Sequence, residues 1–394
     1  MVGNSFGRIF RITTSGESYS GGFRKKADIP DYLYGGLMVI VDGVPPGIKI
    51  TSDLIQQELD KRRPGQSQLD TPRKEKDRVY IFSGVMENDL TTGAPVGMII
   101  PNVDIEDIQI EKHRSYKDVI RPGQAAYTYF KKYGQFADWL GAGRASGRET
   151  AARVAGGAVA KAVLDTMNID VIAYTAELHG IKAKQPITYE FAKKNYRKNE
   201  INCPDLEAAE KMIEEALEIK KQGDTCGGII EIIATGVPAG LGEPVFDKLS
   251  ATIAHGLMSI GAVKGIEFGA GFRHAEMKGS ESNDTPYIDK ETGRVRFKTN
   301  NAGGLLGGIS NGEEIRIRVA VKPTPTISIE QATVNVAKLE NQNVQFKTRN
   351  DPTILPRIYP VCEAMVRIAI LDALYMAKGY RAVAQNIDPR WDNI

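Results

Sequence analysis

Cysteine and histidine are scarce in this sequence, and those present lie far apart. The 394 residues include 3 cysteines, Cys203, Cys226 and Cys362, and 4 histidines. Three distant thiols make neither a disulfide framework nor a zinc-ligand spacing. We therefore expect no metal site, and reduced thiols as in the cytoplasm. His255 falls within a predicted helix over 247–260, so we expect a packed core residue rather than a ligand.

Long apolar runs are also absent. The first ten residues, MVGNSFGRIF, contain no apolar segment of signal-peptide length. Nowhere does the chain reach the ~18 consecutive apolar residues that a membrane-spanning helix needs. We therefore expect a cytoplasmic protein that has no membrane partner.

An excess of charge of one sign is missing as well. Lys and Arg number 51 and Asp and Glu number 49, which gives a formal net charge of +2. Proteins that bind nucleic acid carry a basic field over one face. The most basic segment, 61–77, reads KRRPGQSQLDTPRKEKD and lacks interleaved aromatic residues. It is either a solvated charged loop or a cationic flap over an anionic ligand, and nucleic acid is not the expected partner.

Glycine, in contrast, is abundant, with 40 residues. It frames the stretch Gly141–Gly157, GAGRASGRETAARVAGG, where Ser146 and Glu149 have the spacing of a capping box. A helix of small residues is predicted to begin there, and its N-terminus, flanked by arginines, would seat a phosphate or a carboxylate. The alternative is a glycine-rich turn before an ordinary core helix. A dinucleotide-binding loop is disfavoured because no buried strand precedes the glycines.

Strands and helices alternate along the chain without a regular βαβ rhythm. Alternating apolar residues predict the strands and three- to four-residue spacing predicts the helices. The expected strands are 6–14, 37–41, 79–83, 96–100, 228–234, 263–268 and 314–321, and the expected helices are 52–62, 206–221, 247–260 and 361–378. Ser52 or Asp53 would cap the first helix and Gly379 would end the last. We infer an α+β protein with mixed or antiparallel sheets, a surface excursion at 23–35 and a flexible tail from about 380.

Several separated motifs, taken in order, resemble those of the chorismate synthase family. They are GNSFGRIFRITTSGES, RRPGQS, TPRKEKD, RPGQAAYTY, GRASGRETAARVAGGAVAK, TGVPAGLGEPVFD, AVKGIEFGAGF, NNAGGLLGGISNG, KPTPT and RNDP. One motif alone would be a weak signal, but the ordered set covers nearly the whole chain. The chain is therefore identified as a single domain of this family over 1–394.

The resemblance implies a fold, a reaction and partners. The fold is a β-α-β sandwich with its sheets around a helical layer, usually assembled as a homotetramer. The reaction is the last step of the shikimate pathway, in which a 1,4-elimination of phosphate from 5-enolpyruvylshikimate 3-phosphate gives chorismate. It has no net redox change but requires reduced FMN, for which NADPH or a partner flavin reductase is the candidate source of electrons.

The resemblance also implies the site residues. Those expected to carry catalysis are Asp351, Ser18, Ser146, Tyr19 and Gln124. Those expected to contact FMN are Arg144, Ala145, Ser146, Gly261, Ala262, Gly307, Lys322, Pro323, Thr324, Pro325, Thr326 and Arg349. Those expected to contact substrate or NADP are Arg62, Gln68, Arg121, Arg148 and Arg153. A substrate with a phosphate and two carboxylates needs several arginines.

Two motifs depart from the family pattern where histidines are expected. Tyr19 replaces the histidine of the opening motif, and Gln124 replaces the histidine of the Pro-Gly motif. Those histidines are the family's proposed general acids, toward the flavin and the leaving phosphate. Two hypotheses remain: an active synthase with altered proton transfer, or a flavin- or phosphate-binding relative with little or no catalysis. The retained arginines, glycines and Asp351 favour the enzyme.

Overall fold

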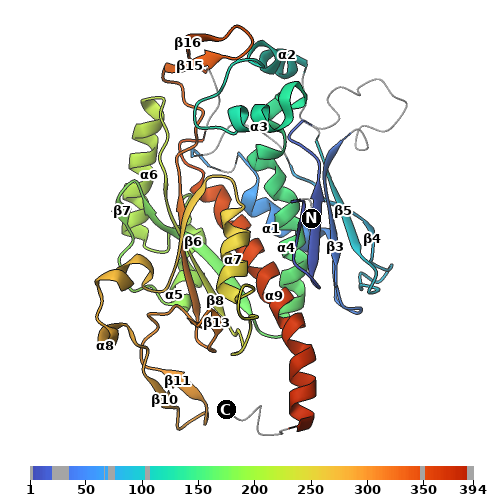
Figure 1. Cartoon of the computed structure of the whole chain (residues 1–394), viewed down its shortest axis with the longest axis vertical. Coiled ribbons are helices and arrows are strands. Elements are labelled where there is room, and N and C mark those ends of the chain that lie inside the picture. The colour runs from blue at the N-terminus through green and yellow to red at the C-terminus, as the bar shows by residue number, and fades with distance from the viewer. Residues whose placement is uncertain are drawn as a thin grey trace.

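Two antiparallel sheets enclose a layer of helices (Figure 1). The computed structural model describes residues 3–19, 35–65, 67–69, 76–102, 107–346 and 351–387. The strand order is β1-β2-β3-β5-β4 in the first sheet and β7-β6-β8-β14-β9 in the second. The expected β-α-β sandwich is therefore confirmed.

The elements have the following bounds. The first sheet contains β1 (Ser5–Phe6), β2 (Arg11–Ser15), β3 (Gly36–Asp42), β4 (Tyr80–Ser83) and β5 (Val96–Pro101). The second contains β6 (Asp170–Leu178), β7 (Ile181–Lys182), β8 (Gly228–Thr235), β9 (Val263–Phe268) and β14 (Ile315–Val321). Two-stranded ribbons are formed by β10 (Pro286–Ile288) with β11 (Val295–Phe297), β12 (Leu305–Leu306) with β13 (Ile309–Ser310), and β15 (Gln331–Asn335) with β16 (Glu340–Val344). The α-helices are α1 (Ser52–Arg62), α2 (Asp107–Ser115), α3 (Ala126–Tyr133), α4 (Thr150–Asp165), α5 (Tyr189–Asn195), α6 (Leu206–Lys221), α7 (Leu249–Met258), α8 (Gly279–Ser282) and α9 (Leu355–Ile387).

The helices α4 and α9 form the centre of the sandwich. α4 packs against β2, β3 and β5 of the first sheet, and α9 packs against β6 and β8 of the second (Figure 1). The two helices approach so closely at Gly157 that an added Cβ would overlap with Ala364 of α9. The small residues predicted for α4 therefore serve the close contact between the two central helices.

The strongest sequence patterns are confirmed. α1, α6 and β9 have the predicted bounds, and β3, β4, β5, β8 and β14 differ by at most one residue at each end. The prediction over 6–14 is wrong, because the chain turns at Gly7, whose φ is 93°, and forms two strands. The predicted caps of α1 are also wrong, since the hydroxyl of Thr51 accepts the hydrogen bond, from the Leu54 amide at 3.0 Å.

Two helical predictions need correction. α7 is shorter than 247–260, and His255 on it is exposed with its ring edge against Phe6, so it is no core residue. α9 begins before the predicted 361 and includes Pro360, which removes only one main-chain donor near the start of the helix. It also continues past Gly379, so the segment after 380 begins as helix.

Two further expectations fall partly outside the described residues. The excursion at 23–35 lies almost entirely within 20–34, and the end of the tail lies within 388–394. In the described parts of the chain, no helix is both long and apolar enough to cross a bilayer.

Candidate active site

The glycine-rich loop before α4 supplies the first part of the site. Gly141 has a φ of 62°, in the left-handed region that favours glycine. Ser146 Oγ accepts a hydrogen bond from the Arg148 amide at 3.3 Å. The carboxylate of Glu149 pairs with Arg153 at 3.0 Å instead of reaching back to Ser146. The predicted capping box is therefore only half formed.

The opening segment lies directly on this loop. Arg144 donates a hydrogen bond to the Gly16 carbonyl oxygen at 3.0 Å. Gly141 faces the Tyr19 ring and the Ser18 hydroxyl so closely that an added Cβ would collide with the ring. The structure thus brings the opening motif and the glycine-rich loop together, although they are far apart in sequence.

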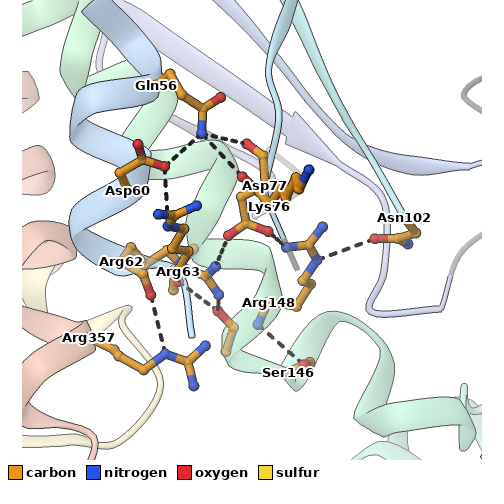
Figure 2. A network of polar contacts seen from close by, with 12 residues as sticks. Gln56, Asp60, Arg62, Arg63, Lys76, Asp77, Asn102, Ser146, Arg148 and Arg357 are labelled. Carbon is orange, nitrogen blue, oxygen red and sulfur yellow. Dashed lines mark hydrogen bonds and ion pairs between the residues drawn. The ribbon is translucent and has the colours of Figure 1, made fainter. Parts of the chain in front are cut away.

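Behind the loop, Asp77 pairs with two arginines from different elements (Figure 2). Arg62 Nη1 lies 2.7 Å from Asp77 Oδ2, and Arg148 pairs with the other carboxylate oxygen. The other nitrogens of Arg62 donate to Thr150 Oγ1 at 2.9 Å and to the Gly147 carbonyl at 2.8 Å. All three charged side chains are buried. We call Arg62, Asp77 and Arg148 the arginine network.

Three of the four arginines expected to contact substrate or NADP, Arg62, Arg148 and Arg153, therefore have protein partners. Arg148 also donates to Asn102 Oδ1 at 3.3 Å, and Arg153 donates to Ser259 Oγ at 2.6 Å. Sequence reasoning missed Asp77, because a carboxylate within a basic segment has the pattern of a solvated charged loop. Its burial, which the local sequence does not indicate, is what distinguishes it.

A second cluster forms where Lys322–Thr326, which we call the lysine loop, meets the turn that holds Gln124. Lys322 Nζ donates to the Gly123 carbonyl at 2.6 Å, and Gln124 Nε2 donates to Thr326 Oγ1 at 2.5 Å. The Lys322 amide donates to the Ala262 carbonyl at 2.9 Å. The structure therefore assembles predicted residues from three distant segments.

This cluster holds two partly buried cations, Lys322 and Arg121. Burial lowers the pKa of Lys322, and the charge of Lys264 lowers it further. Burial also lowers the pKa of Arg121, for which the described residues provide no ion-pair partner. Gln124 Oε1 is buried and accepts no hydrogen bond from any described residue. Two partly buried cations and an unused acceptor fit a phosphorylated ligand that also carries an N–H or O–H group.

Asp351 lies between the two clusters. Its Oδ2 is 2.7 Å from Arg357 Nη1, and its carbonyl oxygen accepts a hydrogen bond from Thr324 Oγ1 at 3.1 Å. Arg357 Nε in turn donates to the Arg62 carbonyl at 3.2 Å (Figure 2). The aspartate expected from the sequence thus joins the lysine loop to the arginine network. Arg349 lies outside the described residues.

Two predicted residues lie apart from these clusters. The Gly307–Gly308 turn accepts a hydrogen bond from the Ser250 amide at the start of α7, whereas Gly261–Ala262 follow its end. A ten-residue helix separates them by about 15 Å. Gln68 is exposed, and its carbonyl accepts a hydrogen bond from Lys220 of α6 at 2.6 Å.

The sequence model of the family described as chorismate synthase matches residues 31–375. The chain belongs to the chorismate synthase family. It is 76% identical over 394 residues to the chorismate synthase of Acetivibrio thermocellus, covering 100% of both chains. The chorismate synthase of Methanococcoides burtonii is 47% identical over 372 residues, 94% of this chain and 96% of the relative. A solved structure described as chorismate synthase matches with a TM-score of 0.70 at 29% identity, covering 94% and 93% of the two chains.

Membership confirms the family expected from the sequence. The chain is a lyase of the shikimate pathway and of aromatic amino acid biosynthesis, acting on a small-molecule substrate with a reduced flavin cofactor. The residues at the lysine loop fit such a cofactor. Lys322 offers a cation to a ring or phosphate, and Gln124 Oε1 offers an acceptor that no described residue uses.

Proposed function

We propose that the chain forms chorismate by eliminating phosphate from 5-enolpyruvylshikimate 3-phosphate between the opening segment, the glycine-rich loop and the lysine loop. One observation carries this proposal: two partly buried cations, Lys322 and Arg121, lie in the segments that meet at the unused oxygen of Gln124. A substrate with a phosphate and two carboxylates supplies the negative charge that these cations require.

The flavin is proposed to be FMN, held by the residues that the family resemblance assigns. The lysine loop and Gly261–Ala262 adjoin one another, and the glycine-rich loop contributes Arg144–Ser146. When bound, reduced FMN would supply the electron density that assists loss of the phosphate. The Lys322 ammonium stabilises negative charge on the bound ring, and Gln124 Oε1 accepts a hydrogen bond from the ligand. Arg349 is proposed to complete the contacts, whereas a role for Gly307, at the other end of α7 from Gly261–Ala262, rests on the family resemblance alone.

The substrate is proposed to bind Arg121 directly, because that guanidinium is desolvated without an ion-pair partner among the described residues. Arg62 and Arg148 share one carboxylate, so the arginine network keeps one excess positive charge behind the site. Its field favours an anion without requiring either side chain to move. Arg153 pairs with Glu149 and donates to Ser259 Oγ, two residues before Gly261, so it is proposed to support that segment rather than to add excess charge.

Proton transfer is proposed to involve Asp351, Ser18, Ser146, Tyr19 and Gln124. Asp351 pairs with Arg357, whose Nη1 lies 2.7 Å from its Oδ2. Gln124 does not titrate, so it can only hydrogen-bond the leaving phosphate or a water. The alternative, a relative that binds flavin without turnover, is favoured only by the replacement of the two histidines.

One assay separates the two functions. Chorismate formation is followed without oxygen, with chemically reduced FMN and 5-enolpyruvylshikimate 3-phosphate. Many chorismates per reduced flavin are expected, because the reaction has no net redox change. Flavin binding without chorismate would leave the non-catalytic function. Oxidation of one flavin per product in the absence of oxygen would contradict the proposed mechanism.

Several partners belong to the same proposal. NADPH, contacted near Gln68, or a separate flavin reductase would reduce the flavin. A homotetramer is supported by large apolar side chains left exposed on the chain, which are Phe136, Phe246 and Phe272 at 84%, 89% and 82%. A cytoplasmic location is consistent with the three free cysteines. One hydrophobic cluster includes residues of both sheets and the central helices, which supports a single domain over 1–394.

A further inference from the structure

Two side chains on one face of α2, Gln109 and His113, close over Tyr19. Tyr19 Oη donates a hydrogen bond to Gln109 Oε1 at 3.1 Å. The rings of His113 and Tyr19 meet edge to face, with centroids 5.2 Å apart and planes inclined at 70°. Residues four apart share a helix face, so a single face of α2 contacts both the hydroxyl and the ring of this tyrosine.

The contact lies at the edge of the proposed site. Tyr19 is only 6% exposed and packs with Ile110 and Leu140 in a small apolar cluster. Leu140 begins the glycine-rich loop, and Gly141 of that loop lies against the Tyr19 ring. His113 itself is half-buried, so its imidazole is next to the site and still reaches solvent.

The other three histidines of the chain lie elsewhere. His179 is on the β6–β7 turn, where it pairs with Glu215 at 2.7 Å, and His255 packs against Phe6. His274 bonds to Ser282 at 3.0 Å. The imidazole at the opening motif is therefore that of His113.

The chemistry of tyrosine leaves a need that an imidazole meets. Tyrosine ordinarily titrates near ~10, so it seldom exchanges its proton at neutral pH. The Tyr19 hydroxyl proton is moreover directed at Gln109. Histidine ordinarily titrates near ~6.5 and can both donate and recover a proton at neutral pH.

We propose that His113 of α2 donates the proton that a histidine in place of Tyr19 would otherwise supply. Tyr19 positions the His113 ring. The inference rests on the proposed function. The carbon–oxygen bond to phosphate breaks, its electron pair leaves on the phosphate oxygen, and the His113 imidazolium gives that phosphate a proton. The ring carbon loses one proton to solvent, and the neutral imidazole takes one up from solvent. One proton is thus released and one is gained, so the balance closes.

Charged residues of both signs lie on the segments around His113. Glu111, Lys112 and Arg114 neighbour it on α2, and Glu17, Tyr19, Asp138 and Arg144 belong to the opening segment and the glycine-rich loop region that meet α2. Glu111 and Arg114 pair at 3.0 Å, and burial raises the pKa of Asp138. Because charges of both signs lie near His113, the variant experiment measures kcat over a range of pH rather than at a single pH.

The first experiment compares His113→Gln with His179→Gln in the anaerobic assay. We expect His113→Gln to lower kcat about 10- to 100-fold, at the lower end of the effect of losing a positioned acid. KM should change less than about twofold, and the limb of the kcat profile near pH ~6.5 should disappear. His179→Gln should match the parent. Adding Tyr19→His to His113→Gln should restore about tenfold and bring the limb back. Parent-like kcat and pH profile in His113→Gln would overturn the proposal.

A second measurement does not depend on turnover. The four imidazoles are followed by NMR as 5-enolpyruvylshikimate 3-phosphate is added without flavin, and the His113 signal is assigned by its loss in His113→Gln. We expect this signal to shift and its titration midpoint to rise, while that of His179 stays in place. An unmoved His113 signal in a saturated complex would overturn the proposal. A parent that binds substrate but forms no chorismate would instead overturn the proposed function, and the NMR result would remain a separate test of His113.

Discussion

Arg62 Nη1 lies 2.7 Å from Asp77 Oδ2, and the two side chains are 3% and 0% exposed. The arginine ends α1, and the aspartate is the last residue of the basic segment 61–77, which sequence patterns favour as a surface loop. Because Arg148 shares the same carboxylate, one negative charge serves two buried cations. Removal of a buried partner costs far more than the pair itself contributes, since it leaves charge without compensation in a poorly solvated place.

Asp77→Asn should therefore destabilise the fold strongly. Leaving a buried charge unpaired typically costs about 3–5 kcal/mol in the free energy of unfolding. The matched control is Asp165→Asn, which breaks the exposed pair with Lys161 on α4 and should cost about 0.3–0.5 kcal/mol. Urea unfolding midpoints provide the comparison. Equal urea midpoints for the two variants would show that removing the Asp77 charge leaves no costly unpaired charge in the arginine network.

Gly157→Ala tests the contact between the central helices. In an exposed helix, replacing glycine by alanine stabilises by up to about 1 kcal/mol. Here the added methyl would overlap with Ala364. Overpacking of this kind costs about 1–3 kcal/mol, so we expect the free energy of unfolding to fall. The control is Gly279→Ala, where a Cβ meets nothing within 4 Å. Thermal unfolding should show a lower Tm for Gly157→Ala and not for Gly279→Ala. A raised Tm for Gly157→Ala would mean that α9 shifts to accommodate the methyl group without loss of stability.

The sequence predicts well the elements whose pattern is local. α6 is amphipathic with a cap and a terminal glycine, and its bounds were predictable to the residue. The predicted helix over 361–378 begins six residues too late, because α9 starts at Leu355 and runs through Pro360. Gly379 illustrates the same limit, since a glycine ends a helix only where the chain leaves it.

Asp170 provides a test of acid stability. Burial would raise its pKa, but hydrogen bonds from Lys193 at 2.7 Å and Tyr189 at 2.6 Å outweigh it and lower the pKa from 3.8 to about 2. A carboxyl with a lowered folded-state pKa stabilises the fold above its unfolded pKa and loses that effect as pH falls through the folded value. The stability difference between parent and Asp170→Asn should thus shrink from about pH 4 to about pH 2.

The measurement is urea unfolding at several pH values. Lys193→Met removes the main partner and should show the same pH-dependent difference from the parent. A difference that stays constant over this range would mean that Asp170 keeps its ordinary pKa in the fold.

The sequence could predict which residues belong to the site but not how they contact one another. Motif resemblance identified Gln124, Lys322 and Asp351, which the structure brings close together. It could not identify Asp77 or Arg357, because their roles depend on contacts with residues distant in sequence. His113 was passed over for the same reason: nothing in its local sequence indicates that α2 turns it toward Tyr19.

Lys322→Met should weaken binding of reduced FMN. A charge-assisted hydrogen bond contributes about 1.5–3 kcal/mol, which corresponds to roughly 10- to 100-fold in the dissociation constant. The control is Lys161→Met, at the opposite end of α4 from the glycine-rich loop. Because burial and Lys264 lower the pKa of Lys322, affinity in the parent should also fall with rising pH before an ordinary lysine, at 10.5, would lose its proton. Anaerobic fluorescence titration measures both effects, and equal affinity in both variants would place the flavin elsewhere.

Gln124→His tests whether the lysine loop lacks a proton donor. The amide of Gln124 bonds to Thr326 at 2.5 Å and cannot titrate, whereas an imidazole could keep that contact and also donate a proton. We expect turnover to rise about tenfold near pH 6, scaled down from the usual effect of a positioned acid because the surroundings have diverged as well. The useful quantity is the ratio of variant to parent kcat, since any ionisation common to both cancels. That ratio should fall toward one as pH rises through ~6.5, because only the protonated imidazole donates. Gln124→Asn is the control, since it keeps an amide but shortens it, and its ratio to the parent should not depend on pH. A flat ratio for Gln124→His would mean that an imidazole at this position delivers no proton to the reacting groups, so that His113 alone would remain the donor to the leaving phosphate.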